Sequence, residues 1–264
     1  MLKLQNVCKT FNPGTVNEKH ALRNIDLHLK EGDFVTILGS NGAGKSTLFN
    51  AIAGSFPVDG GTIRLDGKNI TSQPDYKRSK FIGRLFQDPL RGTAPNMTIE
   101  ENMALAYMRA SAATSPFSMI SKKDREGFRD RLAMLDLGLE DRMSHPVGLL
   151  SGGQRQALTL LMATLVTPKL LLLDEHTAAL DPATAEKVLK LTQKIVKENN
   201  ITCLMITHNV SSALQLGNRT IMMKDGQIVL ELEGEKRANI TTEELLRAFH
   251  QQGMDNDRIL FSAE

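Results

Sequence analysis

One octapeptide restricts the fold of this 264-residue chain more than any other segment does. Residues 39–46 read Gly-Ser-Asn-Gly-Ala-Gly-Lys-Ser, which satisfies the phosphate-loop pattern G-x-x-x-x-G-K-[ST]. The apolar run at residues 34–38 precedes this octapeptide and predicts a buried strand, and a helix is expected to begin near Gly44. The alternative is a glycine-rich turn with a surface lysine, but the strand and helix on either side favour a phosphate loop.

A phosphate loop points successive backbone N–H groups and a helix amino terminus at phosphate oxygens. Lys45 would reach the outer phosphates of a nucleotide, and the Ser46 hydroxyl would lie on Mg²⁺. The residues expected to bind a nucleotide here are Gly39, Ser40, Asn41, Gly42, Ala43, Gly44, Lys45, Ser46 and Thr47.

Two carboxylates follow a second apolar run at residues 170–173. An acid at the end of such a strand holds hydrated Mg²⁺, which makes Asp174 the candidate metal ligand. Glu175 would then lie beside the phosphate, where it can orient or deprotonate the attacking water as a general base. A strand end followed by a helix cap is the alternative, and the phosphate loop upstream makes it the weaker one.

Residues 150–156 read Leu-Ser-Gly-Gly-Gln-Arg-Gln, and Ser151 is expected to cap a helix over residues 152–166. This stretch resembles the signature sequence of the ATP-binding cassette (ABC) ATPases, and the resemblance extends over about residues 2–230. The resemblance implies that the signature faces the γ-phosphate of a nucleotide held by a second subunit. The residues that it assigns to nucleotide binding are Ser151, Gly152, Gly153, Gln154 and Asp181.

Three further residues match elements of that family in the same order along the chain. Gln87 resembles the glutamine that touches Mg²⁺ and the water and links to the membrane partner. His208 resembles the switch histidine, a donor to the γ-phosphate, and Asp181 resembles the aspartate that bridges the two subunits. Together with Lys45 and Glu175, Gln87 and His208 are the expected catalytic residues, and the metal ligands are Ser46, Gln87 and Asp174.

Two positions fit the family less well. Phe11 is the aromatic residue expected to stack on adenine, where the family often has tyrosine; a place in the core is the alternative. His176 follows Glu175 where the family commonly has proline. A histidine can titrate near neutral pH, but we interpret His176 as a tolerated loop substitution without an assigned role.

The alternation of strands and helices predicts an α/β fold of the phosphate-loop NTPase kind, with a mainly parallel sheet flanked by helices. An antiparallel β subdomain and an inserted helical subdomain at about residues 90–155 complete an ATPase domain over residues 1–232, and residues 233–264 form a helical tail. Strands are expected at residues 22–29, 62–65, 81–86 and 201–207, with turns at Asp66-Gly67 and Asp225-Gly226. Helices are expected at residues 98–110, 121–137 and 241–251 and from Asp181-Pro182 onward, with a polar stretch at residues 111–118 and a capping box of Thr98 and Glu101.

Composition narrows the class of partner. Lys and Arg number 32 and Asp and Glu number 30, for a formal charge of +2, so no nucleic-acid partner is expected. Cys8 and Cys203 are far apart and have no CxxC partner, which speaks against a disulfide framework. No export signal and no membrane-spanning segment are expected from the apolar patterning.

The resemblance implies a transporter subunit that binds ATP and Mg²⁺ and hydrolyses ATP. It would act at the cytoplasmic face of the membrane as a head-to-tail homodimer with separate integral membrane permease subunits and an extracytoplasmic solute-binding protein. Uptake of an amino-acid-like solute is the expected role. The alternatives are a soluble ABC ATPase of a non-transport assembly such as iron–sulfur cluster biogenesis, and a phosphate-loop kinase or noncatalytic nucleotide-binding module.

Overall fold

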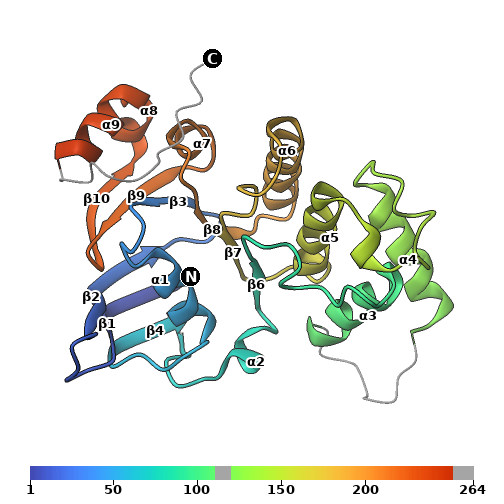
Figure 1. Ribbon diagram of the computed structural model, residues 1–264, viewed down its shortest axis with the longest axis horizontal. Helices are drawn as coiled ribbons and strands as arrows, with labels where there is room; N and C mark the ends of the chain where they lie inside the picture. Colours follow the sequence, from blue (N-terminus) through green and yellow to red (C-terminus); the bar gives the residue numbers. More distant parts are fainter. Residues whose placement is uncertain (111–119, 252–264) are drawn as a thin grey trace. The chain divides into compact units, whose positions relative to one another are not determined.

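A computed structural model describes residues 1–110 and 120–251 of the chain (Figure 1). The chain divides into two compact units, Met1–Arg78 with Thr202–Glu264, and Ser79–Ile201. The polar stretch expected at residues 111–118 lies outside the described residues, as does the end of the expected tail from residue 252.

The first unit contains an antiparallel sheet in the order β2-β1-β4-β5. Apolar residues at alternate positions explain these strands, because successive side chains of a strand point to opposite faces. In β1, for instance, Leu2 and Leu4 are buried while Lys3 is exposed. The turn at Asp66-Gly67 joins β4 to β5 as predicted. The strands are β1 (Leu2–Phe11), β2 (Lys19–Leu29), β4 (Gly60–Leu65) and β5 (Lys68–Asn69).

The second sheet of this unit has the strand order β10-β9-β3-β8. Its central strand β3 (Phe34–Gly39) is buried along its whole length and pairs in parallel with both β8 and β9. Such continuous burial is typical of a parallel strand covered on both faces. The other strands are β8 (Thr202–Ile206), β9 (Arg219–Lys224) and β10 (Gln227–Glu233), and β9 and β10 meet at the predicted Asp225-Gly226 turn.

Five helices of the first unit are described: α1 (Lys45–Ala53), α2 (Asp75–Arg78), α7 (Val210–Gln215), α8 (Gly234–Asn239) and α9 (Thr242–Gln251). The last confirms the helix expected at residues 241–251. The sequence patterns did not predict α2, α7 and α8, which span only four to six residues each. Segments of that length are too short to show a helical period.

Arg78, at the end of α2, is the largest fully buried side chain of the described residues. Its guanidinium donates hydrogen bonds to four backbone carbonyls: Ala51 and Ile52 at the end of α1, and Thr71 and Gln73. The carbonyls of a final helical turn have no partner inside the helix. Arg78 therefore stabilises the end of the helix that begins at the phosphate loop.

The second unit contains a two-stranded parallel pair, β6 (Ile82–Leu85) and β7 (Leu170–Asp174), and its helices. Helix α5 packs against α3, α4 and α6 (Figure 1). Apolar side chains of this unit, Leu158 of α5 among them, form one buried cluster. The helices are α3 (Ile99–Ala110), α4 (Lys122–Ala133), α5 (Gly152–Thr164) and α6 (Pro182–Glu198), with a 3₁₀ turn at Val147–Leu149.

Two predictions about helix ends in this unit can be compared with the structure. The capping box is confirmed, because the Thr98 amide donates to Glu101 Oε2 at 2.7 Å and the Glu101 amide donates to Thr98 Oγ1 at 3.2 Å. The helix expected over residues 121–137 ends earlier, at Ala133. Asp136 adopts a positive φ angle of 53°, which is incompatible with a right-handed helix and lies before the expected end at residue 137.

We predict that Arg78→Ala lowers the free energy of unfolding by on the order of 3 kcal/mol, because two buried and two partly buried hydrogen bonds from a charged donor to carbonyls are lost. Urea denaturation measures the change. Lys77→Ala, which removes an exposed cation from the same helix, should alter stability by less than about 0.5 kcal/mol. Equal effects of the two variants would contradict this role of Arg78.

Candidate functional site

The glycine loop leaves β3 and enters α1 in the conformation that a phosphate loop needs. Gly44 has a φ of 101°, and a Cβ atom there would lie 2.6 Å from the Ala21 carbonyl oxygen, so no other residue fits. Gly44 is also the N-cap of α1, where it has no side chain to occupy the amides of the first turn. The helix amino terminus therefore suits an anionic ligand.

Lys45 is 5% exposed and donates from Nζ to the carbonyl oxygens of Gly39 at 2.6 Å and Ser40 at 2.9 Å. The loop thus curls around its own lysine, whose ammonium is held at the concave side by the backbone. The next residue, Ser46, is exposed at the start of α1.

The parallel pairing of β3 with β8 brings a second candidate to the same edge of the first unit. Ile37 lies beside Ile206, so the phosphate loop and His208 both follow the carboxyl ends of neighbouring strands. Ligands of open α/β sheets bind outside these ends. The structure therefore places the phosphate loop and His208 at one edge of this sheet.

Phe11 ends β1 and is partly buried. Its ring packs edge-on against Phe56, with centroids 5.4 Å apart, and Lys9 Nζ lies 5.6 Å from the Phe11 centroid. These contacts do not distinguish stacking on adenine from a place in the core, so both roles of Phe11 stay predictions.

The second unit repeats this arrangement with β6 and β7. Leu85 lies beside Leu173, so Gln87 and the acidic pair Asp174 and Glu175 follow the carboxyl ends of two adjacent parallel strands. Gln87 is exposed, and the two acids are partly buried. Glu175 has a φ of 47°, a left-handed conformation that few non-glycine residues adopt. Backbone strain of this kind is concentrated at functional sites.

His176 differs from the interpretation as a tolerated loop substitution, because it is 1% exposed. Its Nε2 lies 3.1 Å from Thr192 Oγ1, which itself donates to the Val188 carbonyl at 2.8 Å. Nε2 must therefore carry the proton that it donates to Thr192. Burial lowers the pKa of His176 to about 4, so the imidazole stays neutral at physiological pH. His176 ties the residue after Glu175 to α6.

The signature stretch forms the start of α5, where Ser151 is the N-cap. The Gln154 amide donates to Ser151 Oγ and the Ser151 amide donates to Gln154 Oε1, both at 3.2 Å. The Gln154 side chain, expected to contact nucleotide, is thus part of a capping box. A Cβ atom on buried Gly153 would overlap Thr184 Cγ2 of α6, so this glycine permits close packing of two helices.

Asp181 caps the helix on the other side of this contact. Its carboxylate accepts from the Thr184 amide at 3.0 Å, and hydrogen bonds from the Thr184 side chain and then from this amide lower the pKa of Asp181. A Cβ atom on Gly152 would lie 3.3 Å from Leu180 Cδ2. The structure therefore brings the signature and the predicted aspartate loop together within the second unit.

The oxygen atoms among these residues fit Mg²⁺, which is bound in nucleotide sites through one or two carboxylates together with substrate phosphates. In the second unit Asp174 carries a partly buried carboxylate at a strand end, and in the first unit Ser46 carries an exposed hydroxyl; their roles as metal ligands stay predictions. In the described part of the chain, no group of three or more His, Cys, Asp and Glu residues could hold a metal alone.

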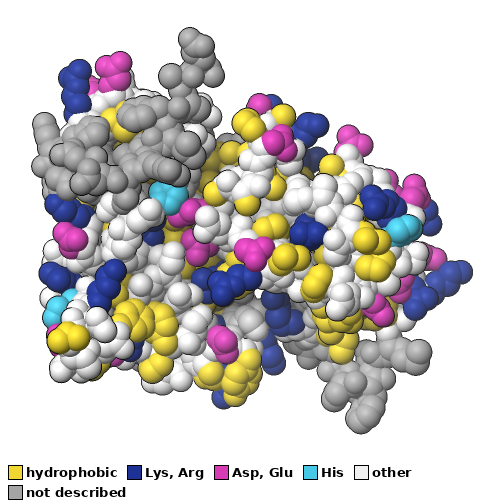
Figure 2. All heavy atoms as spheres, in the orientation of Figure 1, with side chains coloured by type: hydrophobic (Ala, Val, Ile, Leu, Met, Phe, Trp, Pro, Cys, Tyr) yellow, Lys and Arg dark blue, Asp and Glu magenta, His cyan; other side chains and the backbone are white. Residues whose placement is uncertain are grey.

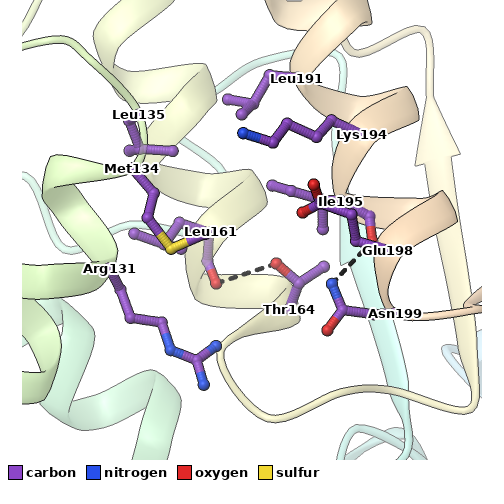
Figure 3. A pocket seen from close by; sticks show the side chains of 10 residues that line it. All are labelled: Arg131, Met134, Leu135, Leu161, Thr164, Leu191, Lys194, Ile195, Glu198 and Asn199. Carbon is purple, nitrogen blue, oxygen red and sulfur yellow. Dashed lines mark hydrogen bonds between the residues drawn. The ribbon is translucent and has the colours of Figure 1, made fainter.

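A separate cavity of about 340 Å³ lies between α4, α5 and α6 (Figure 3). Thr164 and Asn199 bond to carbonyls of their own helices, Leu161 at 3.3 Å and Ile195 at 2.9 Å. None of the predicted site residues lines the cavity. The lining residues are Arg131, Met134, Leu135, Leu161, Thr164, Leu191, Lys194, Ile195, Glu198 and Asn199.

The charge of the surface and the lengths of the helices bear on which partners the chain can have. On the face shown in Figure 2, basic and acidic side chains are interspersed. Over residues 1–110 and 120–251, no helix combines the length and the apolar character needed to cross a bilayer.

The packing of Gly153 gives a stability prediction. Gly153→Ala should destabilise the chain by about 1–3 kcal/mol, the usual cost of overpacking, because the new methyl group meets Thr184. Adding Thr184→Ser, which removes the opposing methyl group and keeps the amide bond to Asp181, should recover most of the loss. Urea denaturation of the three variants tests this, and a double variant no more stable than Gly153→Ala would contradict it.

The burial of His176 gives a pH prediction. A folded-state pKa below the unfolded value of about 6.5 means that the unfolded chain takes up the proton first, so stability is lost as pH falls from 6.5 toward 4. When the pH is lowered from 7 to 5, the free energy of unfolding of the parent should fall by about 2 kcal/mol more than that of His176→Asn. Urea denaturation in EDTA at both pH values measures this. Parallel losses would show that His176 is solvated.

Comparison with known proteins identifies the family. The family model described as ABC transporter matches residues 22–178. A tyrosine transport ATP-binding protein of Clostridioides difficile is 44% identical over 94% of this chain and 98% of its own length. A glycine betaine/carnitine/choline transport ATP-binding protein of Bacillus subtilis is 33% identical over 87% of this chain and 57% of its own length.

The fold has solved counterparts as well. A dimeric ATP-binding cassette, MJ0796, in a post-hydrolysis state with ADP and Pi, matches with a TM-score of 0.76 and 32% identity. The match covers 88% of this chain and 98% of that one, and it confirms the predicted α/β fold. With its phosphate loop, acidic pair and signature helix in place, the chain belongs to the ABC transporter family and is an ATPase of that family.

Proposed function

We propose that this chain hydrolyses ATP to drive uptake of an amino-acid-like solute through separate integral membrane subunits. The observation that carries the proposal is the 44% identity to a tyrosine transport ATP-binding protein over nearly the full length of both chains. An extracytoplasmic solute-binding protein would deliver the solute, and the chain would lie at the cytoplasmic face of the membrane against its permease partners.

In the proposed site, the first unit holds the nucleotide and contacts its γ-phosphate. The amides of residues 39–47 and the Lys45 ammonium bind the phosphates, and His208 donates to the γ-phosphate. Phe11 stacks on the adenine. Bound Mg²⁺, held by Ser46, Gln87 and Asp174, would neutralise charge that develops on the phosphate oxygens.

Glu175 is the proposed general base. Its left-handed backbone follows the Asp174 strand end, and His176 anchors the next position to α6 through Thr192. This anchoring limits the positions that the carboxylate can take. Fixed geometry favours removal of a proton from one water molecule as that molecule attacks the γ-phosphate.

The signature requires a second chain in this proposal. Ser151, Gly152, Gly153 and Gln154 face the γ-phosphate bound by a partner, and Asp181 bridges the two subunits. Two copies then pack head to tail with twofold symmetry and enclose two nucleotides. Loss of the γ-phosphate on hydrolysis removes contacts that both chains share, so the dimer loosens and moves the attached membrane subunits.

We predict that Glu175→Gln, which removes the base but keeps the shape, binds ATP and turns over more slowly by on the order of a hundredfold or more. It should elute as a dimer from size-exclusion chromatography with MgATP and as a monomer with MgADP. Adding Ser151→Arg should abolish the dimer by obstructing the signature helix. Parental turnover would contradict the base, and a monomer in saturating MgATP would contradict the composite site.

A further inference from the structure

An arginine that no family motif explains lies beside the proposed metal ligand. Arg84, in the otherwise apolar strand β6, places Nη2 3.7 Å from Asp174 Oδ2. Both side chains are 14% exposed. In the sequence, Arg84 stands out as a charged residue inside the apolar run at residues 81–86. Its partner, Asp174, becomes apparent only in the structure.

The strand register explains why the two side chains meet. Arg84 lies beside Leu172 in the parallel β6–β7 pair, and Asp174 is two residues farther along β7. Residues two apart in a strand share a face, so Arg84 and Asp174 lie on the same face of this pair. The pairing of the strands therefore fixes the contact.

Arg84 is held by stacking and charge rather than by a hydrogen-bond network. Its guanidinium carbon lies 4.5 Å from the centroid of the Phe86 ring. Its Nε is buried without a hydrogen-bond partner in the described residues. Arg91 is near enough to act on Arg84 electrostatically, and that interaction is repulsive. The ion pair with Asp174 is thus the favourable charge interaction of this guanidinium.

We propose that Arg84 is a positioning residue that competes with Mg²⁺ for Asp174, so that the metal stays bound only while the nucleotide's phosphates share it. This inference rests on the proposed function, in which Asp174 is a metal ligand. A carboxylate in so enclosed a place is costly without a cation. Arg84 supplies that cation when the metal has left, and its charge opposes the returning metal.

The consequence concerns product release. A metal that Asp174 holds weakly depends on the phosphate oxygens for most of its binding. After hydrolysis to ADP and phosphate, fewer phosphate oxygens would share a bound metal, and Arg84 would neutralise Asp174 once the metal is gone. A merely structural arginine would fill space over Phe86 without changing the affinity for the metal.

The test measures binding of a fluorescent ADP analogue to the full chain at increasing Mg²⁺, which needs no turnover. Arg84→Met keeps the length of the stem and removes the charge, and it should lower the half-saturating Mg²⁺ concentration by about tenfold, as expected for one charge at this distance in a partly screened site. Arg84→Lys, which keeps the charge, should stay within about twofold of the parent. Arg91→Met is the matched control for charge and should also stay within about twofold.

Asp174→Asn separates this inference from the proposed function. If Asp174 is a ligand, Asp174→Asn raises the required Mg²⁺, and adding Arg84→Met to it produces no further tenfold shift. The competition would be overturned if Arg84→Met kept the parental half-saturating Mg²⁺ concentration while Asp174→Asn raised it. It would also be overturned if Arg91→Met lowered that concentration as much as Arg84→Met does. An Asp174→Asn chain with the parental Mg²⁺ requirement would overturn the ligand assignment itself. Arg84→Gln gives the same readout if the methionine variant does not fold.

Discussion

The candidate chemistry of this chain depends on the parallel pairing of buried strands. In the first unit, β3 and β8 end together and are followed by the phosphate loop and His208. In the second unit, β6 and β7 end together and are followed by Gln87 and the acidic pair. Strands paired in this way are mostly apolar on both faces, and the candidate site residues follow their carboxyl ends. The strand pairing that forms the buried core therefore also determines where the candidate site residues lie in each unit.

Residues outside the motifs support the residues inside them. Arg78 binds the carbonyls at the far end of the helix that begins at the phosphate loop, and His176 joins the residue after Glu175 to α6. Arg84 pairs with the acid that precedes Glu175. Each of these side chains is buried or nearly so and polar, which is costly unless its groups are paired. Arg78 offsets this cost with four hydrogen bonds, whereas Nε of Arg84 and Nδ1 of His176 have no hydrogen-bond partner among the described residues.

The sequence predicted the parts that local patterns specify. The phosphate loop, the capping box of Thr98 and Glu101 and both Asp-Gly turns were found from neighbouring residues alone. Burial of His176 and the Arg84–Asp174 pair could not be predicted, because each depends on packing between segments distant in sequence. The roles of the site residues stay predictions, because they concern ligands. The division into an ATPase domain over residues 1–232 and a tail also stays a prediction, because only sequence patterns define that boundary.

The central claim is that one nucleotide lies between the phosphate loop of one chain and the signature of another. Complementation tests it most directly, by measuring ATP hydrolysis of Lys45→Ala and Ser151→Arg chains separately and mixed. Each variant alone should be inactive, because every site of its dimer carries a defect. A mixed dimer has one intact site, with Lys45 from one chain and Ser151 from the other, so mixing should restore hydrolysis. A mixture as inactive as its components would contradict a site shared between chains.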